Sequence, residues 1–349
     1  MGLPKIIAGV LLFFLFAQAP AQTVDELRQQ LTAAGTDSAR ARLSGVLAYK
    51  LAFTDTTEAL RLTSEEIRLA ATGDSLLLLA DAYRTRGLIR AIQNRLPDAM
   101  DNYSLSLSYA GRANSKYYQA ACKGLIAGMY QDNADYVNAL KYYLDGLADA
   151  EKGGDKRQIG SFCNNIATVY GAAGREPALC LKYYALAMQQ ATAINNLAFA
   201  GLIANNMAGE YLRAGKNDSA EIMIKAALGF SDQSGTKAYE HAVVLTGAGE
   251  VYAKLNKSIE AERMLIEAIA LFDTLKRPIN VLNPVMVLCS LYIEQNKIAE
   301  AEVLCNRLLR DGHFYNARMY IRESYKMLST ISQKRNKYQQ ALANYTQYS

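Results

Sequence analysis

The chain has 349 residues, of which 51% are hydrophobic and 20% charged, and its formal net charge is +5. This much apolar material predicts a large core and excludes a disordered chain. The composition also excludes collagen, a disulfide-dense miniprotein and a multispanning membrane protein. So small a net charge gives no reason to expect a nucleic-acid partner.

The first twenty-one residues have the layout of a secretory signal peptide. Lys5 supplies a positive start, residues 6–16 are apolar apart from one glycine, and Ala19 and Ala21 are the small residues of a cleavage site. We expect cleavage after Ala21 and a periplasmic or secreted mature chain. An uncleaved membrane anchor is the alternative, but the apolar run is shorter than the ~20 residues that a span needs.

Residues 22–37 contain a short helical pattern and a polar loop, which predicts an N-terminal cap. From residue 38 to residue 349 one pattern repeats every 40 or 41 residues. Its marker is an alanine, replaced once by cysteine, at Ala59, Ala99, Ala139, Cys180, Ala220, Ala261, Ala301 and Ala341. Such regularity favours one repeat array over a bundle of unrelated helix pairs.

Other residues keep a fixed place around each marker. A tyrosine precedes it by nine or ten residues in five copies, a small residue lies three before that tyrosine, and a bulky or apolar residue follows the marker by four. A short polar turn with asparagine or glycine separates the two halves. Spacings of three and four residues define one face of a helix, so each copy predicts two helices joined by a tight turn.

This pattern of small residue, tyrosine, turn, alanine and bulky residue resembles the tetratricopeptide repeat (TPR). The resemblance implies an all-α fold, a right-handed superhelical solenoid of about eight helix-turn-helix repeats. The copies here are longer than the common unit of about 34 residues, and the early tryptophan and late proline of the family pattern are absent. The first, second and last copies lack the tyrosine, as divergent end copies of repeat arrays often do.

The last copy is shorter than the others, because only eight residues follow Ala341. Repeat arrays usually end in a polar capping helix. We therefore expect either that the natural polypeptide continues, into a membrane-bound signalling module for example, or that something covers this end. An ordinary frayed terminus is the alternative.

The sequence offers little for catalysis. His241 and His313 lie in different repeats with no other strong ligand at metal spacing, which excludes an obvious zinc site and predicts surface or helix-end positions. Nucleotide-binding and nucleophile motifs are absent, and the acidic pair Glu65 and Glu66 is expected on a solvated helix face. We expect no catalytic residue, no cofactor and no metal, so an enzyme is the weakest hypothesis.

Five cysteines are present, and an exported protein could oxidise them. Cys289 and Cys305 occupy the small and bulky marker positions of one repeat, which face each other in a helix pair, so a disulfide between them is conceivable. The alternative is that all five are small buried apolar residues.

The best binding candidates lie on the first helix of each pair, which lines the concave side of a TPR superhelix. Two asparagine pairs lie 41 residues apart, one repeat, and are expected to stack on one wall. Asparagine donates and accepts, so it can read a peptide backbone, as it often does in the TPR family; a structural role is the alternative. The candidate ligand-binding residues are Asn164, Asn165, Thr168, Asn205, Asn206, Arg213 and Glu250.

Two functions remain. One is an exported scaffold that binds a peptide or protein in its groove. The other is the sensory region of a larger transducer, because the signal peptide, the cap and the segments "LAYKLAFTDTTEALRL", "GDKRQIG" before "NNIATVY", and "NKYQQALANYTQYS" resemble the periplasmic TPR regions of bacterial membrane-bound histidine kinases. No kinase segment is present in this chain, so no kinase activity follows from the resemblance.

Overall fold

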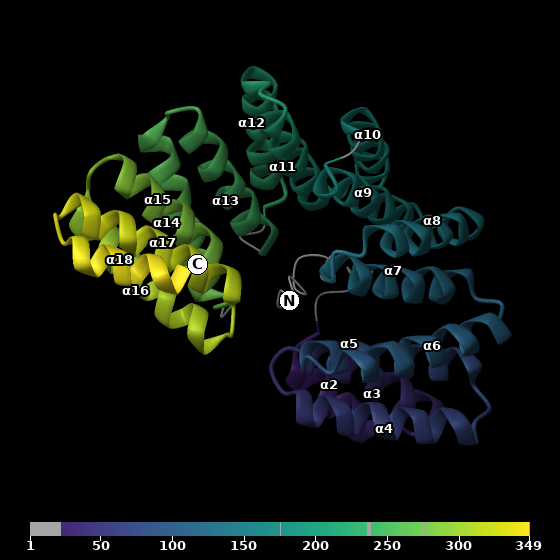
Figure 1. Cartoon of the computed structure of the whole chain (residues 1–349). Coiled ribbons are helices and arrows are strands. Elements are labelled where there is room, and N and C mark those ends of the chain that lie inside the picture. Colours follow the sequence, from purple (N-terminus) through teal and green to yellow (C-terminus); the bar gives the residue numbers. More distant parts are fainter. Residues whose placement is uncertain (1–21, 175, 236–238, 276, 349) are drawn as a thin grey trace. The chain divides into compact units, whose positions relative to one another are not determined.

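The computed structural model describes residues 22–174, 176–235, 239–275 and 277–348, and every regular element in them is a helix (Figure 1). The expected signal peptide lies outside the described residues. The all-α helical-repeat prediction is confirmed. The first helix, α2 (Val24–Ala33), lies where the cap was expected and begins with a capping box between Thr23 and Glu26.

Eight helix pairs follow α2, one for each marker. Their first helices are α3 (Asp37–Leu51), α5 (Leu76–Ile92), α7 (Lys116–Asp132), α9 (Lys156–Ala172), α11 (Leu197–Arg213), α13 (Tyr239–Lys254), α15 (Leu282–Glu294) and α17 (Arg318–Lys334). Their second helices are α4 (Thr56–Thr72), α6 (Leu96–Arg112), α8 (Tyr136–Gly153), α10 (Pro177–Ala193), α12 (Asn217–Gln233), α14 (Ser258–Thr274), α16 (Ile298–Phe314) and α18 (Tyr338–Tyr348).

The described helices form two compact units. The N-terminal unit ends at Glu176 and contains α2 to α9, and the C-terminal unit begins at Pro177 and contains α10 to α18. The boundary falls inside the fourth repeat, between its two helices. The single continuous superhelix that the periodicity predicts stays a prediction across this boundary.

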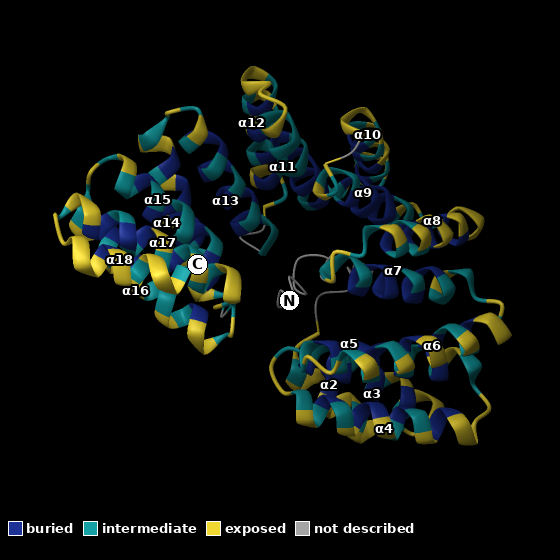
Figure 2. Ribbon diagram, in the orientation of Figure 1, coloured by how far each residue is buried: buried dark blue, intermediate teal, exposed yellow. Residues whose placement is uncertain are grey.

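The marker residues form the core of each pair. All eight alanine-position residues are at most 4% exposed, and bulky residues four positions later, such as Tyr103, Tyr143 and Leu265, are at most 2% exposed, whereas Tyr345 of the last copy is 54% exposed. Small side chains at these positions allow the two helices to approach, and the large side chains fill the remaining space. Figure 2 shows buried residues along α7, α9 and α13, and exposed residues at the turns and along second helices such as α8 and α18.

The turns follow from backbone stereochemistry. Most helices end at a residue with positive φ, and nearly all of these residues are asparagine or glycine, for example Asn94, Gly154, Gly215 and Asn256. Glycine and asparagine adopt this left-handed conformation most readily. The turn positions recur about every 20 residues, so first and second helices have nearly equal lengths.

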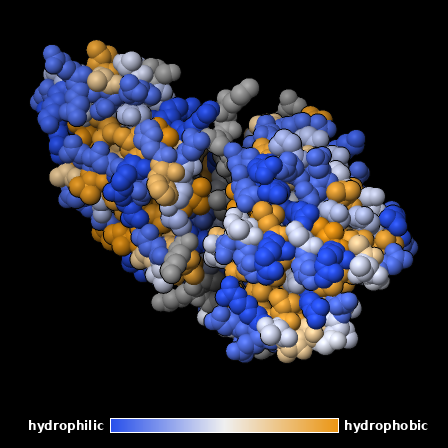
Figure 3. All heavy atoms as spheres, turned by 90° about the horizontal axis from the view of Figure 1, so that it is seen from below, coloured by the Kyte–Doolittle hydropathy of each residue, from blue (hydrophilic) through white to orange (hydrophobic). Residues whose placement is uncertain are grey.

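The outer helices carry isolated apolar side chains. Val137, Ile259 and Val303, on three different second helices, are 79%, 83% and 70% exposed. On the face shown in Figure 3, apolar patches alternate with hydrophilic ones. Among the described residues, no helix is long and apolar enough to cross a membrane.

Candidate binding surface

Within each unit the first helices form an inner layer. In the N-terminal unit α3 packs against α5, α5 against α7 and α7 against α9. In the C-terminal unit α11 packs against α13, α13 against α15 and α15 against α17. Six of the second helices each pack between two successive first helices: α4, α6, α8, α12, α14 and α16. Side chains of a first helix that turn away from its second helices therefore lie on the inner face.

Four polar residues from four successive first helices meet on the inner face of the C-terminal unit. We call Asn205, Glu250, Asn283 and Tyr320 the polar row; they lie on α11, α13, α15 and α17. Asn283 Nδ2 donates a hydrogen bond of 2.7 Å to Glu250 Oε1. The Tyr320 hydroxyl lies close enough to Glu250 for its charge to act on the phenol.

Asn205 packs against a glycine of the neighbouring helix α13. Its carboxamide lies directly on Gly247 of α13, so closely that a Cβ on Gly247 would lie 1.8 Å from Asn205 Oδ1. Glu250 follows Gly247 by one helical turn and shares its face. The carboxamide oxygen of Asn205 is buried and has no hydrogen-bond partner among the described residues.

Glu250 is a half-buried carboxyl group without a counter-charge. Burial raises its pKa above the ordinary value, and the hydrogen bond from Asn283 opposes this rise only in part. Among the described residues no lysine or arginine pairs with Glu250. Burial raises the pKa of Tyr320, and the negative charge of Glu250 adds a smaller rise.

Asn164 and Asn165 of α9 are only 1% and 3% exposed, so they lie within the packed helices of the N-terminal unit. Asn164 Nδ2 donates to Asn165 Oδ1 at 3.2 Å, and the Thr168 hydroxyl donates to the Asn164 carbonyl at 2.9 Å. Asn165 Nδ2 has no partner among the described residues. The expected stack with Asn205 would cross the boundary between the two units and stays a prediction.

The remaining predicted residues lie on α11, Asn206 in its middle and Arg213 at its last position. Asn206 is half-buried, and the guanidinium of Arg213 forms an ion pair with Glu210 one turn earlier on the same helix.

Of the predicted residues, the polar row thus contains Asn205 and Glu250. It also contains Asn283 and Tyr320, which the sequence analysis did not select. The repeat register gave no signal for Asn283, because the same register holds Leu202 and Val243 in the two preceding copies.

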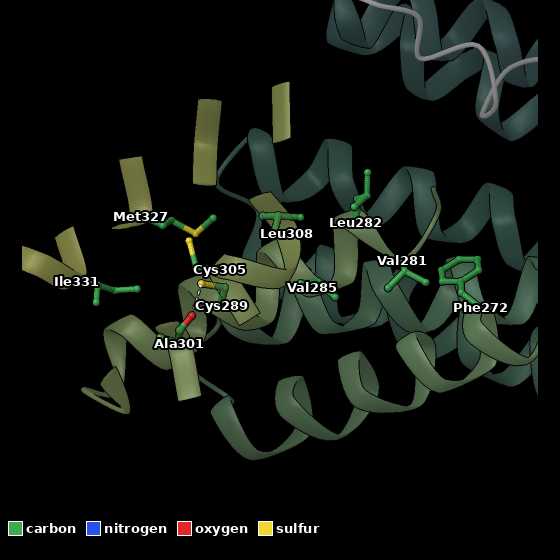
Figure 4. Close-up of a cluster of buried hydrophobic side chains, with 11 residues drawn as sticks. Phe272, Val281, Leu282, Val285, Cys289, Ala301, Cys305, Leu308, Met327 and Ile331 are labelled. Atoms are coloured by element: carbon green, nitrogen blue, oxygen red, sulfur yellow. Dashed lines mark hydrogen bonds between the residues drawn. The ribbon is translucent and has the colours of Figure 1, made fainter. Parts of the chain in front are cut away.

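Cys289 and Cys305 are neighbours in a buried cluster with Leu308 and Met327, but they are free thiols (Figure 4). Cys289 Sγ donates to the Ala301 carbonyl at 3.3 Å, and Cys305 Sγ donates to a carbonyl of α17 at 3.2 Å. The spacing therefore predicted their proximity, whereas the structure contains no disulfide between them. All five cysteines are buried, as expected for small apolar residues.

The surface position predicted for Glu66 was wrong. Glu66 is 0% exposed, because Gly45 of α3 leaves room for its carboxyl group between helices. His241 lies in the first turn of α13, a helix-end position as expected, although it is only 9% exposed; its Nδ1 lies 2.7 Å from the Ser231 hydroxyl. Glu65, by contrast, pairs with Arg68 at 2.7 Å on the surface. Among the described residues no group of three or more His, Cys, Asp or Glu side chains could hold a metal.

No protein-family model and no curated protein matches the chain, whereas many solved structures do. The apo form of the quorum sensor NprR from B. thuringiensis has a TM-score of 0.65 at 16% identity and covers 92% of this chain and 90% of its own. A Rap protein complexed with Competence and Sporulation Factor has a TM-score of 0.60 at 14% identity, covering 88% and 96%.

A third structure names the repeat. It is a signal transduction ATPase with a tetratricopeptide repeat sensor from Pyrococcus horikoshii, with a TM-score of 0.59 at 14% identity, covering 95% of this chain and 53% of its own. At these identities the likeness shows the fold alone. The fold is that of TPR-like helical repeat proteins.

Proposed function

We propose that this protein is an exported TPR scaffold that binds a peptide or an extended protein segment on its inner face and has no catalytic activity of its own. The observation that carries the proposal is the polar row, where, among the described residues, the buried Asn205 carboxamide oxygen lacks a hydrogen-bond partner and the Glu250 carboxyl group lacks a counter-charge. A peptide backbone and its side chains offer the missing donors. A structure of NprR in complex with its cognate peptide NprX, with a TM-score of 0.52 at 15% identity, supports a peptide as the ligand class.

The proposal is tested with an array of capped random decapeptides and purified mature chain, followed by solution titration of the best binders. Asn205→Ala removes the unpaired carboxamide and should weaken binding about tenfold. Asn306→Ala, which removes an exposed carboxamide from the outer helix α16, should leave affinity unchanged. Failure of the array to yield any binder, or equal affinity of both variants, would contradict the proposal.

A sensory role within a larger transducer is the second candidate. It is supported by the leader-like residues 1–21 and by the resemblance of the repeat segments to periplasmic sensor regions. The measurement is the intact mass and compartment of the native protein. A mass near the mature chain in a soluble extracytoplasmic fraction supports the free scaffold, whereas a much larger mass in the membrane fraction supports the sensory region.

A further inference from the structure

The carboxyl group of Glu250 differs from other partly buried acids in its unit. Glu262 on the outer helix α14 pairs with Lys297 at 2.9 Å, and Glu221 on α12 pairs with Lys257 at 2.6 Å. Glu250 has only the neutral amide of Asn283. These two outer carboxylates therefore have a lysine partner, whereas the inner carboxylate of Glu250 has no cationic partner among the described residues.

An uncompensated carboxylate in a desolvated place is costly, because burial disfavours the charged form. Glu250 nevertheless remains half-buried rather than enclosed, so a ligand on the inner face can reach it. Among the described residues, Asn283 donates to Glu250, Glu250 acts on the nearby phenol of Tyr320, and Asn205 lies against Gly247 one turn away on the same helix; none of these three is a cation. A bound positive charge would supply the missing compensation.

The rest of the polar row points to the same ligand chemistry. Asn205 presents a buried oxygen without a donor, and the amide of Asn283 is already used by Glu250. The site therefore presents hydrogen-bond acceptors, while the phenol ring of Tyr320 can lie beside a cation. The net charge of +5 gives the whole chain no general attraction for cations, so the preference must be local.

We propose that the polar row selects peptides that place a cationic group, an ammonium or a guanidinium, against Glu250. This inference rests on the proposed function and names its ligand class. The ammonium can come from a lysine side chain or from a free N-terminus. Charge-assisted hydrogen bonds to a desolvated carboxylate are stronger than neutral ones, so the cation would determine which peptides bind.

The test uses three pools of random heptapeptides in solution titrations. The first pool is capped at both ends and carries a fixed lysine or arginine; the second is identical except that the fixed residue is acetyl-lysine or citrulline. The third pool has a neutral fixed residue and a free N-terminus. We expect the first or the third pool to bind about tenfold more tightly than the second, and the better of the two identifies the source of the cation.

Variants locate this preference. Glu250→Gln is nearly isosteric and should abolish the preference, and Glu250→Asp should retain part of it. Glu262→Gln is the matched control, because it removes one carboxylate from an outer helix of the same unit, and it should leave the preference unchanged. The preference of the wild-type chain should also disappear at acid pH, as Glu250 becomes protonated.

Equal binding of the charged and neutral pools by the wild-type chain would overturn the cation proposal and leave the peptide-binding function standing. A preference that survives in a folded Glu250→Gln variant would also overturn it. If no pool binds at all, both the inference and the proposed function fail. If the glutamine variant does not fold, the pH dependence of the wild-type chain still tests the cation proposal, because a preference that persists at acid pH would overturn it.

Discussion

Gly146 of α8 lies directly against the ring of Phe162 in α9. A Cβ on Gly146 would lie 2.4 Å from the Cε1 and Cζ atoms of the ring. Phe162 is 0% exposed and packs edge-on against Tyr143, with ring centroids 6.3 Å apart. The ring therefore has no free space into which it could move, and the approach of the two helices depends on the glycine.

We predict that Gly146→Ala lowers the free energy of unfolding by about 1–3 kcal/mol, the usual cost of overpacking a core. The measurement is urea unfolding followed by circular dichroism. The control is Gly111→Ala in α6, where an added Cβ meets nothing within 4 Å. That variant should gain about 0.5–1 kcal/mol from helix propensity, and a similar gain at Gly146 would refute the packing argument.

The contact between Gly247 and Asn205 leads to a different prediction. A Cβ on Gly247 would occupy the place of the Asn205 carboxamide, which is the end of a rotatable side chain. Gly247→Ala should therefore displace this carboxamide and weaken peptide binding about tenfold, with little loss of thermal stability. Gly229→Ala on α12, where nothing lies within 4 Å, should leave affinity unchanged. Unaltered binding by Gly247→Ala would exclude Asn205 from the site.

The repeat could be predicted from sequence because its determinants lie within one helix pair. Ala139 and Tyr143 are four residues apart and both fully buried, as one helical face requires. The contacts of Glu250 could not be predicted in this way, because Asn283 lies 33 residues away in the next repeat. The burial of Glu66 likewise depends on the missing side chain of Gly45 on another helix. Distances across repeats depend on how successive pairs stack, which spacing alone does not specify.

Asp149 forms a buried charge cluster with two lysines of α7. Its carboxylate lies 2.6 Å from Lys123 Nζ and 3.2 Å from Lys116 Nζ. Burial alone would raise the pKa of Asp149, but the hydrogen bonds from the two lysines outweigh it and lower the pKa. Asp149→Ala should cost about 1–3 kcal/mol at neutral pH, less than a fully buried pair because both lysines are partly solvated.

The pH dependence of this cost follows from the lowered pKa. The contribution of Asp149 is complete above the unfolded pKa of about 3.8 and is lost as the pH falls through the lower folded value. Urea unfolding of the wild type and Asp149→Ala should therefore converge at strongly acid pH. Asp145→Ala, at an exposed position of the same helix, is the control and should cost little at any pH. A cost that is equal at acid and neutral pH would contradict the ion-pair explanation.

The cysteines are expected to be unreactive in the folded chain. Burial raises the pKa of Cys122 to about 11 and that of Cys163 to about 12. The hydrogen bond with Cys289, followed by burial, raises the pKa of Cys305. Because the thiolate is the reactive form, iodoacetamide should modify none of them before unfolding and all five afterwards. A native mass that is lower by two hydrogens would instead show a disulfide.

Glu250→Gln should stabilise the unliganded chain, because the wild-type carboxylate has no counter-charge. The folded pKa of Glu250 lies above the ordinary value of 4.5, so the folded state binds more protons than the unfolded state between the two values. The wild type therefore loses stability as the pH rises through this window. Thermal unfolding should show a Tm advantage of the glutamine variant that is absent below about pH 4.5 and grows toward neutral pH. Asn283→Leu, which removes the hydrogen bond that Asn283 donates to Glu250, should lower the Tm at neutral pH, and a stabilising effect of that change would contradict the contact.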